Sequence, residues 1–245
     1  MIFLNQNAKH KNKELNYIHT HNTGDSIPYR INNLGFRGKD WEDGEEGHIL
    51  CVGDALTFGV GIPQIETWPE KLSRDIGTHY HNLSCYDWSN DHIWFNTMQY
   101  LRRGWGWKPV AIFILWTIFD RRFHFMSDKD IMHLAVHSGK GNQSPIHTSI
   151  TDAYLYINND ENNSVNFSKS FYSLKDYCET EGIDFYCAGV VPQKANWFGI
   201  EMKDFKNEYE TFKGGAKDGV HPGREFHQHI SDYFSTQIID NQQVR

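Results

Sequence analysis

The chain carries apolar runs separated by segments in which apolar and polar residues alternate at helical spacing. Three of the runs have almost no polar position, which is typical of strands covered on both faces of a sheet. They lie at residues 48–53, 110–116 and 184–191. A shorter strand is expected at 80–84. The pattern therefore predicts a sheet whose main strands are buried.

Helices are predicted between these strands. The segment 66–77 has a proline near its start, acidic residues first and a glycine at its end, which are helix start and stop signals. The segment 167–182 carries apolar residues at helical spacing and also ends in glycine. Two more helices are expected at about 91–103 and at 224–239. This alternation predicts an α/β fold with a parallel sheet, right-handed crossovers and helices on both faces.

The length and the polar segments indicate how the chain is divided. The 245 residues suffice for one sizeable α/β domain, and nothing in the composition demands a second. Residues 1–28 are polar and show neither period, so we expect an N-terminal extension and then a single domain at 29–245. Between about 126 and 166 the periodicity fades over more residues than an ordinary loop contains. We expect an insertion there, with a short helix near 128–136, that forms a wall or lid of a pocket.

Charge and composition exclude several classes of protein. A formal net charge of −7 argues against binding to a phosphate backbone, so we expect no nucleic-acid partner. The four cysteines form no CxxC pair, which favours reduced, buried thiols. The apolar part of the amino terminus is too short for a signal peptide, and no run approaches the length of a membrane span. We therefore expect no membrane insertion, and a protein that is cytoplasmic, virion-associated or released by cell lysis.

Two short motifs at opposite ends of the chain carry candidate chemistry. The first buried strand stops at Gly-Asp-Ala-Leu, residues 53–56, which would deliver a small residue to the carboxyl edge of the sheet. Far along the chain, Asp218 stands three residues before His221, and a proline follows. Such spacing lets a carboxylate reach one nitrogen of the imidazole while the other nitrogen faces a nucleophile.

These motifs resemble the first and last blocks of the SGNH (GDSL-type) hydrolase family, which read Gly-Asp-Ser-Leu, or a close variant, and Asp-x-x-His-Pro. The resemblance implies a flavodoxin-like fold with strand order 2-1-3-4-5 and a site at the carboxyl ends of the strands. It also implies that His221 is the general base and that Asp218 orients it. The nucleophile position is held by Ala55, which has no oxygen to attack a substrate. The chain as written therefore cannot run the family's covalent mechanism.

The two middle blocks of the family are matched less well. Residues 82–91 resemble the second block, but Asp87 replaces a glycine whose backbone N–H belongs to the oxyanion hole. A carboxylate beside a developing oxyanion would oppose it. Residues 116–121 correspond to the third block, where Ile118 or Phe119 replaces an asparagine donor. Neither of these side chains can donate a hydrogen bond.

Neighbouring groups are candidates for the missing donor. The backbone N–H of Ala55 is expected to line the oxyanion hole, and Thr117 or Arg121 could replace the asparagine. Asp120 is a further candidate binding residue, and the alternative is that it forms a surface ion pair with Arg121 of little energetic consequence. Upstream, the segment 29–38 resembles the lead-in to the first block, in which Arg37 could pair with a buried carboxylate.

No cofactor or metal site is predicted. The glycines after the first strand lack the spacing of a P-loop or a dinucleotide fingerprint. Asp54 also places a negative charge where a phosphate-binding loop needs N–H groups. The histidine pairs at 79 and 81 and at 133 and 137 lack a cysteine or acidic partner that would complete a metal site.

Two functional hypotheses remain open. In the first, the chain is an esterase or acetyl-esterase-like hydrolase for a small-molecule or glycan ester, of a carbohydrate or a lipid, and Ala55 makes it inactive. In the second, it is a natural pseudoenzyme that serves as a glycan-binding or structural, virion-associated module, as a homo-oligomer or in a larger assembly. The intact pair of Asp218 and His221 favours the first. The departures at Ala55, Asp87 and the third block favour the second.

Overall fold

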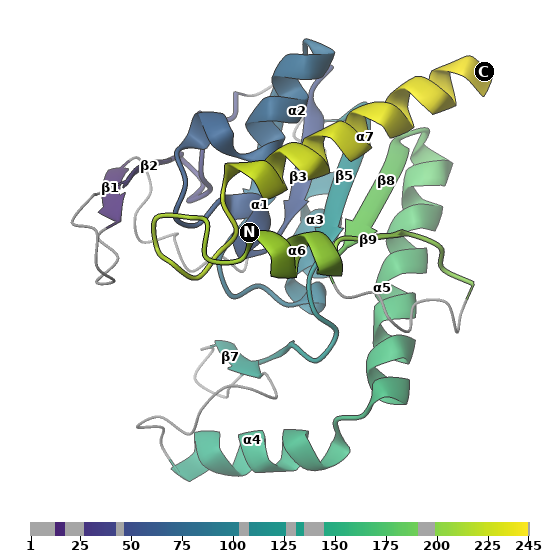
Figure 1. Ribbon diagram of the computed structural model, residues 1–245. Coiled ribbons are helices and arrows are strands. Elements are labelled where there is room, and N and C mark those ends of the chain that lie inside the picture. The colour runs from purple at the N-terminus through teal and green to yellow at the C-terminus, as the bar shows by residue number, and fades with distance from the viewer. Residues whose placement is uncertain are drawn as a thin grey trace.

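The computed structural model describes residues 13–17, 27–42, 47–102, 108–125, 131–134, 145–190 and 199–244. Its centre is a five-stranded parallel sheet with the order β4-β3-β5-β8-β9 (Figure 1). The strands are β3 (Ile49–Gly53), β4 (Tyr80–Ser84), β5 (Ala111–Trp116), β8 (Asp184–Gly189) and β9 (Lys203–Asp204). Counted along the chain within this sheet, the order is 2-1-3-4-5, so the expected α/β fold class and strand order are confirmed.

Successive residues of the central strands face the two sides of the sheet. Leu50 and Val52 of β3 belong to one apolar cluster, and Ile49 and Cys51 belong to another. Every residue of β3 and β5 is buried. Helices must therefore cover both faces, as the apolar runs predict.

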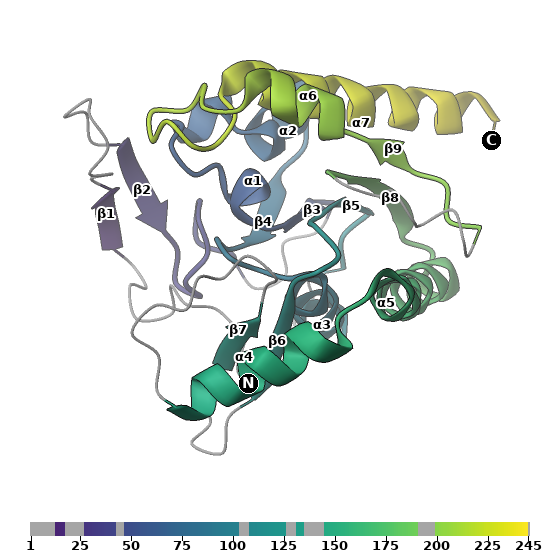
Figure 2. The ribbon, with the colours of Figure 1, turned by 60° about the horizontal axis from the view of Figure 1, so that its bottom comes forward.

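The described residues contain seven α-helices, of which some cover the two faces of the sheet. They are α1 (Ala55–Phe58), α2 (Trp68–Ile76), α3 (Asn90–Leu101), α4 (Pro145–Ile157), α5 (Asp160–Glu181), α6 (Lys206–Phe212) and α7 (Arg224–Val244), with a 3-10 turn η2 (Gln64–Glu66). Figure 2 shows α2 and α7 packed together on one side of the strands and α3 and α5 on the other. The predicted α2 begins with Pro69 in its first turn and ends at Gly77 in the left-handed conformation.

The segment expected as an insertion has a different local structure from the one predicted. Residues 131–134, expected in a helix at 128–136, form strand β7 (Ile131–Leu134), which pairs antiparallel with β6 (Arg122–Phe125). The helix prediction is wrong there because pairing with a segment nearby in space outweighs a local helical preference. Helix α5 starts at Asp160, not Phe167, because Asn159 accepts the N–H of Asn162 and caps it.

The strand that precedes the first block packs directly on it. Strand β2 (Ile27–Ile31) pairs with β1 (Lys13–Tyr17), and the expected boundary between extension and domain falls inside β2. The alternate residues Ile27, Tyr29 and Ile31 are buried against a group that includes Ala55. This part of the N-terminal segment therefore supports the turn after β3.

Arg37 makes a different contact from the one expected. Its guanidinium donates to the carbonyl oxygens of Phe58, Gly59 and Ile62 at 2.8, 2.6 and 2.8 Å, and it lies 4.2 Å over the ring of Tyr29. The predicted carboxylate partner of Arg37 is therefore wrong, and three backbone carbonyls accept its hydrogen bonds instead. Arg37 thus holds the turn that follows the candidate nucleophile position.

Two further features concern the thiols and the helices. All four cysteines are free, and Cys51, Cys85 and Cys178 are buried. Within the described residues, no helix has both the length and the apolar composition that crossing a membrane requires.

Candidate active site at the carboxyl ends of the strands

Ala55 lies where β3 ends and α1 begins. Gly53 is required just before it, because a Cβ there would stand 2.0 Å from Thr57 Oγ1 and 2.9 Å from the carbonyl oxygen of Leu115. Asp54 then caps α1, with its Oδ1 accepting the N–H of Leu56 at 3.0 Å. The carbonyl of Asp54 accepts the N–H groups of Thr57 and Phe58. The local sequence therefore produces a sharp strand-to-helix turn with Ala55 at its tip.

The backbone N–H of Ala55 has no acceptor in this turn. Within the described part of the chain no hydrogen bond is formed by it, although Ala55 is only 7% exposed. An unpaired N–H at a helix start is a donor available to an anion. The N–H of Ala55 is therefore a donor that a bound anion can use.

The second motif forms a tightly bonded pair. The Nδ1 of His221 lies 2.5 Å from Oδ2 of Asp218, whose side chain is 0% exposed. The other oxygen, Oδ1, accepts the backbone N–H groups of Val220 and His221, each at 2.9 Å. Burial would raise the pKa of Asp218, but these hydrogen bonds outweigh burial and lower it to about 2. Asp218 therefore stays ionised and fixes the imidazole with Nδ1 as the donor.

The turn after α1 and the loop of the second motif touch each other. The N–H of Lys217 donates to the carbonyl of Gly61 at 2.9 Å. Gly61 has a φ of 79°, and a Cβ there would lie 2.9 Å from Cβ of Ala216 and 3.0 Å from Cγ of Asp218. Only glycine permits this approach. The structure thus joins the motifs that lie more than half the chain apart.

Thr117 and Arg121 both bind Asp54. The hydroxyl of Thr117 donates to Oδ2 of Asp54 at 2.5 Å, and Nη1 of Arg121 lies 3.4 Å from the same oxygen. Thr117 is held in place because its backbone N–H and C=O pair with the side chain of Asn90, at 3.0 Å each. The hydroxyl proton of Thr117 is therefore used inside the protein, whereas the side chain of Arg121 is 31% exposed.

Two residues of the third block beyond Thr117, Phe119 and Asp120, make separate contacts. Phe119 stacks on Phe167 with ring centroids 4.3 Å apart, and it packs against the core. The carbonyl of Asp120 accepts the hydroxyl of Tyr154. Within the described residues, Oδ1 of Asp120 is buried without a hydrogen-bond partner, and no ion pair joins Asp120 to Arg121.

Asp87 occupies the glycine position of the second block with a glycine-like backbone. Its φ is 63°, and it is the one described residue other than glycine with a positive φ. The side chain is exposed. The chain therefore keeps the turn geometry that a glycine would give and directs a carboxylate toward solvent.

Tyr209 on α6 is a partly buried phenol that no sequence signal marks. Its ring packs against Phe226 of α7, with ring centroids 6.0 Å apart. Burial first, and the charge of Asp54 second, raise the pKa of Tyr209. Neither a motif nor a clear helical pattern marks α6 in the sequence.

No group of three metal-binding side chains gathers in the described residues. Burial lowers the pKa of two histidines outside this site, His81 and His227, which are 1% and 0% exposed. The side chains of residues 133 and 137 lie outside the described part of the structure.

Comparison with known proteins gives similarity at the level of the fold. No protein-family model matches the chain, and no curated protein matches it. Among solved structures, it is similar to a provisionally assigned lipolytic protein of the G-D-S-L family from Desulfitobacterium hafniense DCB-2, with 12% identity, coverage of 78% of this chain and 99% of that one, and a TM-score of 0.47. It is also similar to the psychrotrophic esterase EstA from Pseudoalteromonas sp., with 12% identity, coverage of 81% and 100%, and a TM-score of 0.46.

A third similar structure is an acetyl xylan esterase, Est2A, from the rumen bacterium Butyrivibrio proteoclasticus. The identity is 10%, the coverage is 90% of this chain and 67% of that one, and the TM-score is 0.40. All three TM-scores are below 0.5, so the chemistry of the site must be derived from the chain's own geometry.

Proposed function

We propose that the chain descends from SGNH (GDSL-type) serine hydrolases and that its cleft binds an ester of a carbohydrate or a lipid, which Ala55 prevents it from hydrolysing. The observation that supports this most is the pair of His221 and Asp218. A buried carboxylate with both oxygens hydrogen-bonded, one of them to Nδ1, is what an imidazole base needs to hold a single tautomer. A loop with only a structural role would not need the imidazole.

The parent reaction follows from these positions. A serine hydroxyl at position 55 would attack the ester carbonyl carbon, and Nε2 of His221 would take its proton. Within the described residues Nε2 has no hydrogen bond, so it is available for this transfer. The alcohol would leave with the proton, and water activated by the same nitrogen would release the acid. The alanine stops this sequence before its first bond forms.

The oxyanion would be met by backbone groups first. The unpaired N–H of Ala55 is one donor, and the N–H of Asp87 stands where the second block supplies another. Thr117 is a weaker candidate because its proton is used by Asp54. Arg121 is partly exposed and would contribute positive charge. Asp120 has a buried carboxylate oxygen without a hydrogen-bond partner in the described residues, and we keep it as a candidate binding residue on that ground.

The replacement Ala55→Ser tests this proposal. We expect measurable hydrolysis of short-chain p-nitrophenyl esters by the serine form, above the background of the alanine form. The matched control is Ala55→Ser combined with His221→Ala, which should lose about 100-fold or more of the gain because the general base is gone. Equal rates for the alanine and serine forms would count against the hydrolase lineage of the site.

A second function is favoured by the third block. Phe119 packs in the core, and the hydroxyl of Thr117 donates to Asp54. Neither residue therefore replaces the asparagine that donates to the oxyanion in the family's third block. We propose as the alternative a pseudoenzyme that binds glycans or serves a structural, virion-associated role, as a homo-oligomer or in a larger assembly. This alternative predicts that the protein binds glycans on an array or that it self-associates in sedimentation velocity. A blank array together with a monomeric profile would remove its support.

A further inference from the structure

The outer edge of β4 opens into a cavity of about 600 Å³ that lies away from the carboxyl ends of the strands. Strand β4 ends the sheet, so only one of its edges is paired, with β3. Four successive residues, from His79 to Asn82, line the cavity. The cavity therefore runs along an open strand edge.

The register shows which backbone groups face the cavity. Ile49 is the partner of Tyr80, and its N–H donates to the carbonyl of His79 at 2.9 Å. In a parallel ladder a residue bonds to the two neighbours of its partner, so His79 and His81 direct their backbone groups at β3. The N–H and C=O of Tyr80 and Asn82 therefore point outward. No hydrogen bond within the described residues reaches those four groups.

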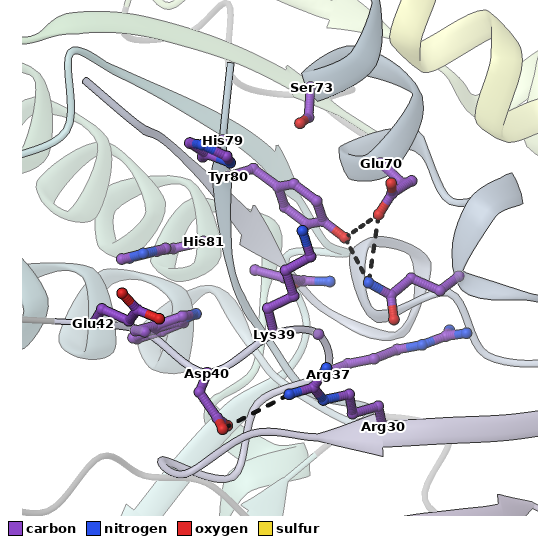
Figure 3. Close-up of a pocket in the computed structure, with 14 residues that line it drawn as sticks. Arg30, Arg37, Lys39, Asp40, Glu42, Glu70, Ser73, His79, Tyr80 and His81 are labelled. Atoms are coloured by element: carbon purple, nitrogen blue, oxygen red, sulfur yellow. Dashed lines mark hydrogen bonds and ion pairs between the residues drawn. The ribbon is translucent and has the colours of Figure 1, made fainter. Parts of the chain in front are cut away.

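Side chains of β4 leave this edge clear. Figure 3 shows Tyr80 directed toward Glu70 on α2 and His81 directed to the opposite side, beside Glu42. The hydroxyl of Tyr80 donates to Oε2 of Glu70 at 2.8 Å and accepts from Gln64 at 3.0 Å. The open backbone groups thus lie between a wall formed by α2 and η2 and a wall formed by 38–42.

The two walls limit which kind of partner can reach the outer edge of β4. A second copy of the sheet would have to bring its own edge between them, whereas a single extended chain needs a spacing of only about 4.8 Å from β4. Five residues of β4 span about 16 Å, enough for a peptide of about five residues. A sugar lacks a stacking platform here, because Trp41 is sandwiched between Phe36 and His81, at 5.1 and 4.6 Å.

The cavity is lined by three basic side chains, of Arg30, Arg37 and Lys39, and by three acidic ones, of Asp40, Glu42 and Glu70, so a preference for an acidic side chain is local to Lys39. Arg30 lies 3.7 Å from Asp40, so these two charges compensate each other. Lys39 is exposed at the cavity, and within the described residues it has no ion pair or side-chain hydrogen bond. Its ammonium in Figure 3 points into the space beside Tyr80.

We propose that the outer edge of β4 binds an extended peptide segment of another protein, which adds to the sheet as a sixth strand and places an acidic side chain against Lys39. Main-chain hydrogen bonds to Tyr80 and Asn82 supply the affinity in this mode, and the charge supplies selectivity. Neither Ala55 nor His221 is among the residues that line this cavity.

The test is a titration of the 15N-labelled protein with an acetylated, amidated hexapeptide of alternating threonine and valine that carries one central aspartate. We expect saturable shifts of the Tyr80 and Asn82 amides, with a Kd of about 1 mM or tighter. Peptides N-methylated at odd or at even amides should differ about ten-fold in affinity, because only one set faces β4. Equal affinities would overturn the proposal, and so would unshifted amides at about 5 mM peptide.

The charge preference has its own matched control. Lys39→Gln should weaken binding of the aspartate peptide about three-fold and leave binding of the same peptide with asparagine unchanged. If both peptides bind both proteins equally, the acidic preference is wrong. Shifts of the same amides by xylo-oligosaccharide but not by either peptide would make the edge a glycan site and overturn the peptide assignment.

Discussion

At the scale of single residues, the hydroxyl of Thr117 has a larger structural role than its sequence position suggests. It donates to Asp54, the residue that caps α1, and both side chains are buried. A hydrogen bond to a buried carboxylate stabilises more than one between neutral groups. Thr117 therefore links the third block to the first.

We predict that Thr117→Val destabilises the protein by about 2–3 kcal/mol, because it removes a donor to a charged, buried acceptor without changing the shape of the side chain. The matched variant Thr117→Ser keeps the donor and should cost only about 1 kcal/mol for the lost methyl. Urea denaturation measures both. A valine form as stable as the serine form would show that the bond to Asp54 contributes little.

At the scale of elements, the contact between the turn after α1 and the loop before α7 assembles the site. Gly61 makes this contact, whereas Gly77 has a similar φ, 68°, but nothing within 4 Å of a Cβ. Comparing substitutions at the two glycines therefore separates the energetic cost of backbone strain from the cost of steric overlap.

Gly77→Ala should cost about 1 kcal/mol, which is the strain of the left-handed conformation for alanine. Gly61→Ala should cost about 2–4 kcal/mol, because its methyl group also overlaps Ala216 and Asp218. Thermal or urea unfolding gives both values. Equal losses would mean that the two loops do not pack as closely as the structure shows.

The elements that the sequence predicts are those with strong local signals. Strands β3, β4, β5 and β8 and helix α2 fall close to their predicted bounds, since their apolar runs or caps are local features. The two-residue strand β9 and helix α6 have too few residues for a period to be visible. Strand β7 depends on pairing with β6, and α5 begins at an asparagine cap that the apolar spacing does not reveal.

Some contacts of the candidate site also follow from local sequence, and others depend on the fold. The spacing of Asp218 and His221 lies within one loop, so the hydrogen bond between them follows from the sequence. The use of Thr117 by Asp54 and the position of Tyr209 depend on elements that meet only in the fold. A sequence pattern cannot show that the hydroxyl of Thr117 donates to Asp54 and not to a bound substrate.

At the scale of the whole molecule, two buried histidines couple stability to pH. His227 is 0% exposed and its Nδ1 accepts the N–H of Trp68 at 3.1 Å, while His81 is 1% exposed and bonds to Tyr100. Burial is the main cause that lowers the pKa of each to about 3. Both therefore stay neutral in the folded state, where an unfolded chain would bind protons below about pH 6.5.

The free energy of unfolding should accordingly fall as the pH drops from about 6.5 toward 3. The unfolded state then binds up to two more protons than the folded state, so the slope approaches at most about 2.7 kcal/mol per pH unit. Above pH 7 this contribution is fully present. Urea midpoints at pH 7, 6, 5 and 4.5 measure the slope, and a constant midpoint over this range would contradict the neutral state of these histidines.

For the whole site, we propose that Asp218, His221 and the backbone at position 55 serve a nucleophile that Ala55 lacks. Reaction with a fluorophosphonate, followed by intact mass and peptide mapping, tests this most directly because the reagent needs an activated hydroxyl and a receptive oxyanion hole together. We predict one adduct, at position 55, for Ala55→Ser, and none for the alanine form or for Ala55→Ser with His221→Ala. A correctly folded serine form that stays unlabelled would show that His221 and the backbone at position 55 do not activate a nucleophile there.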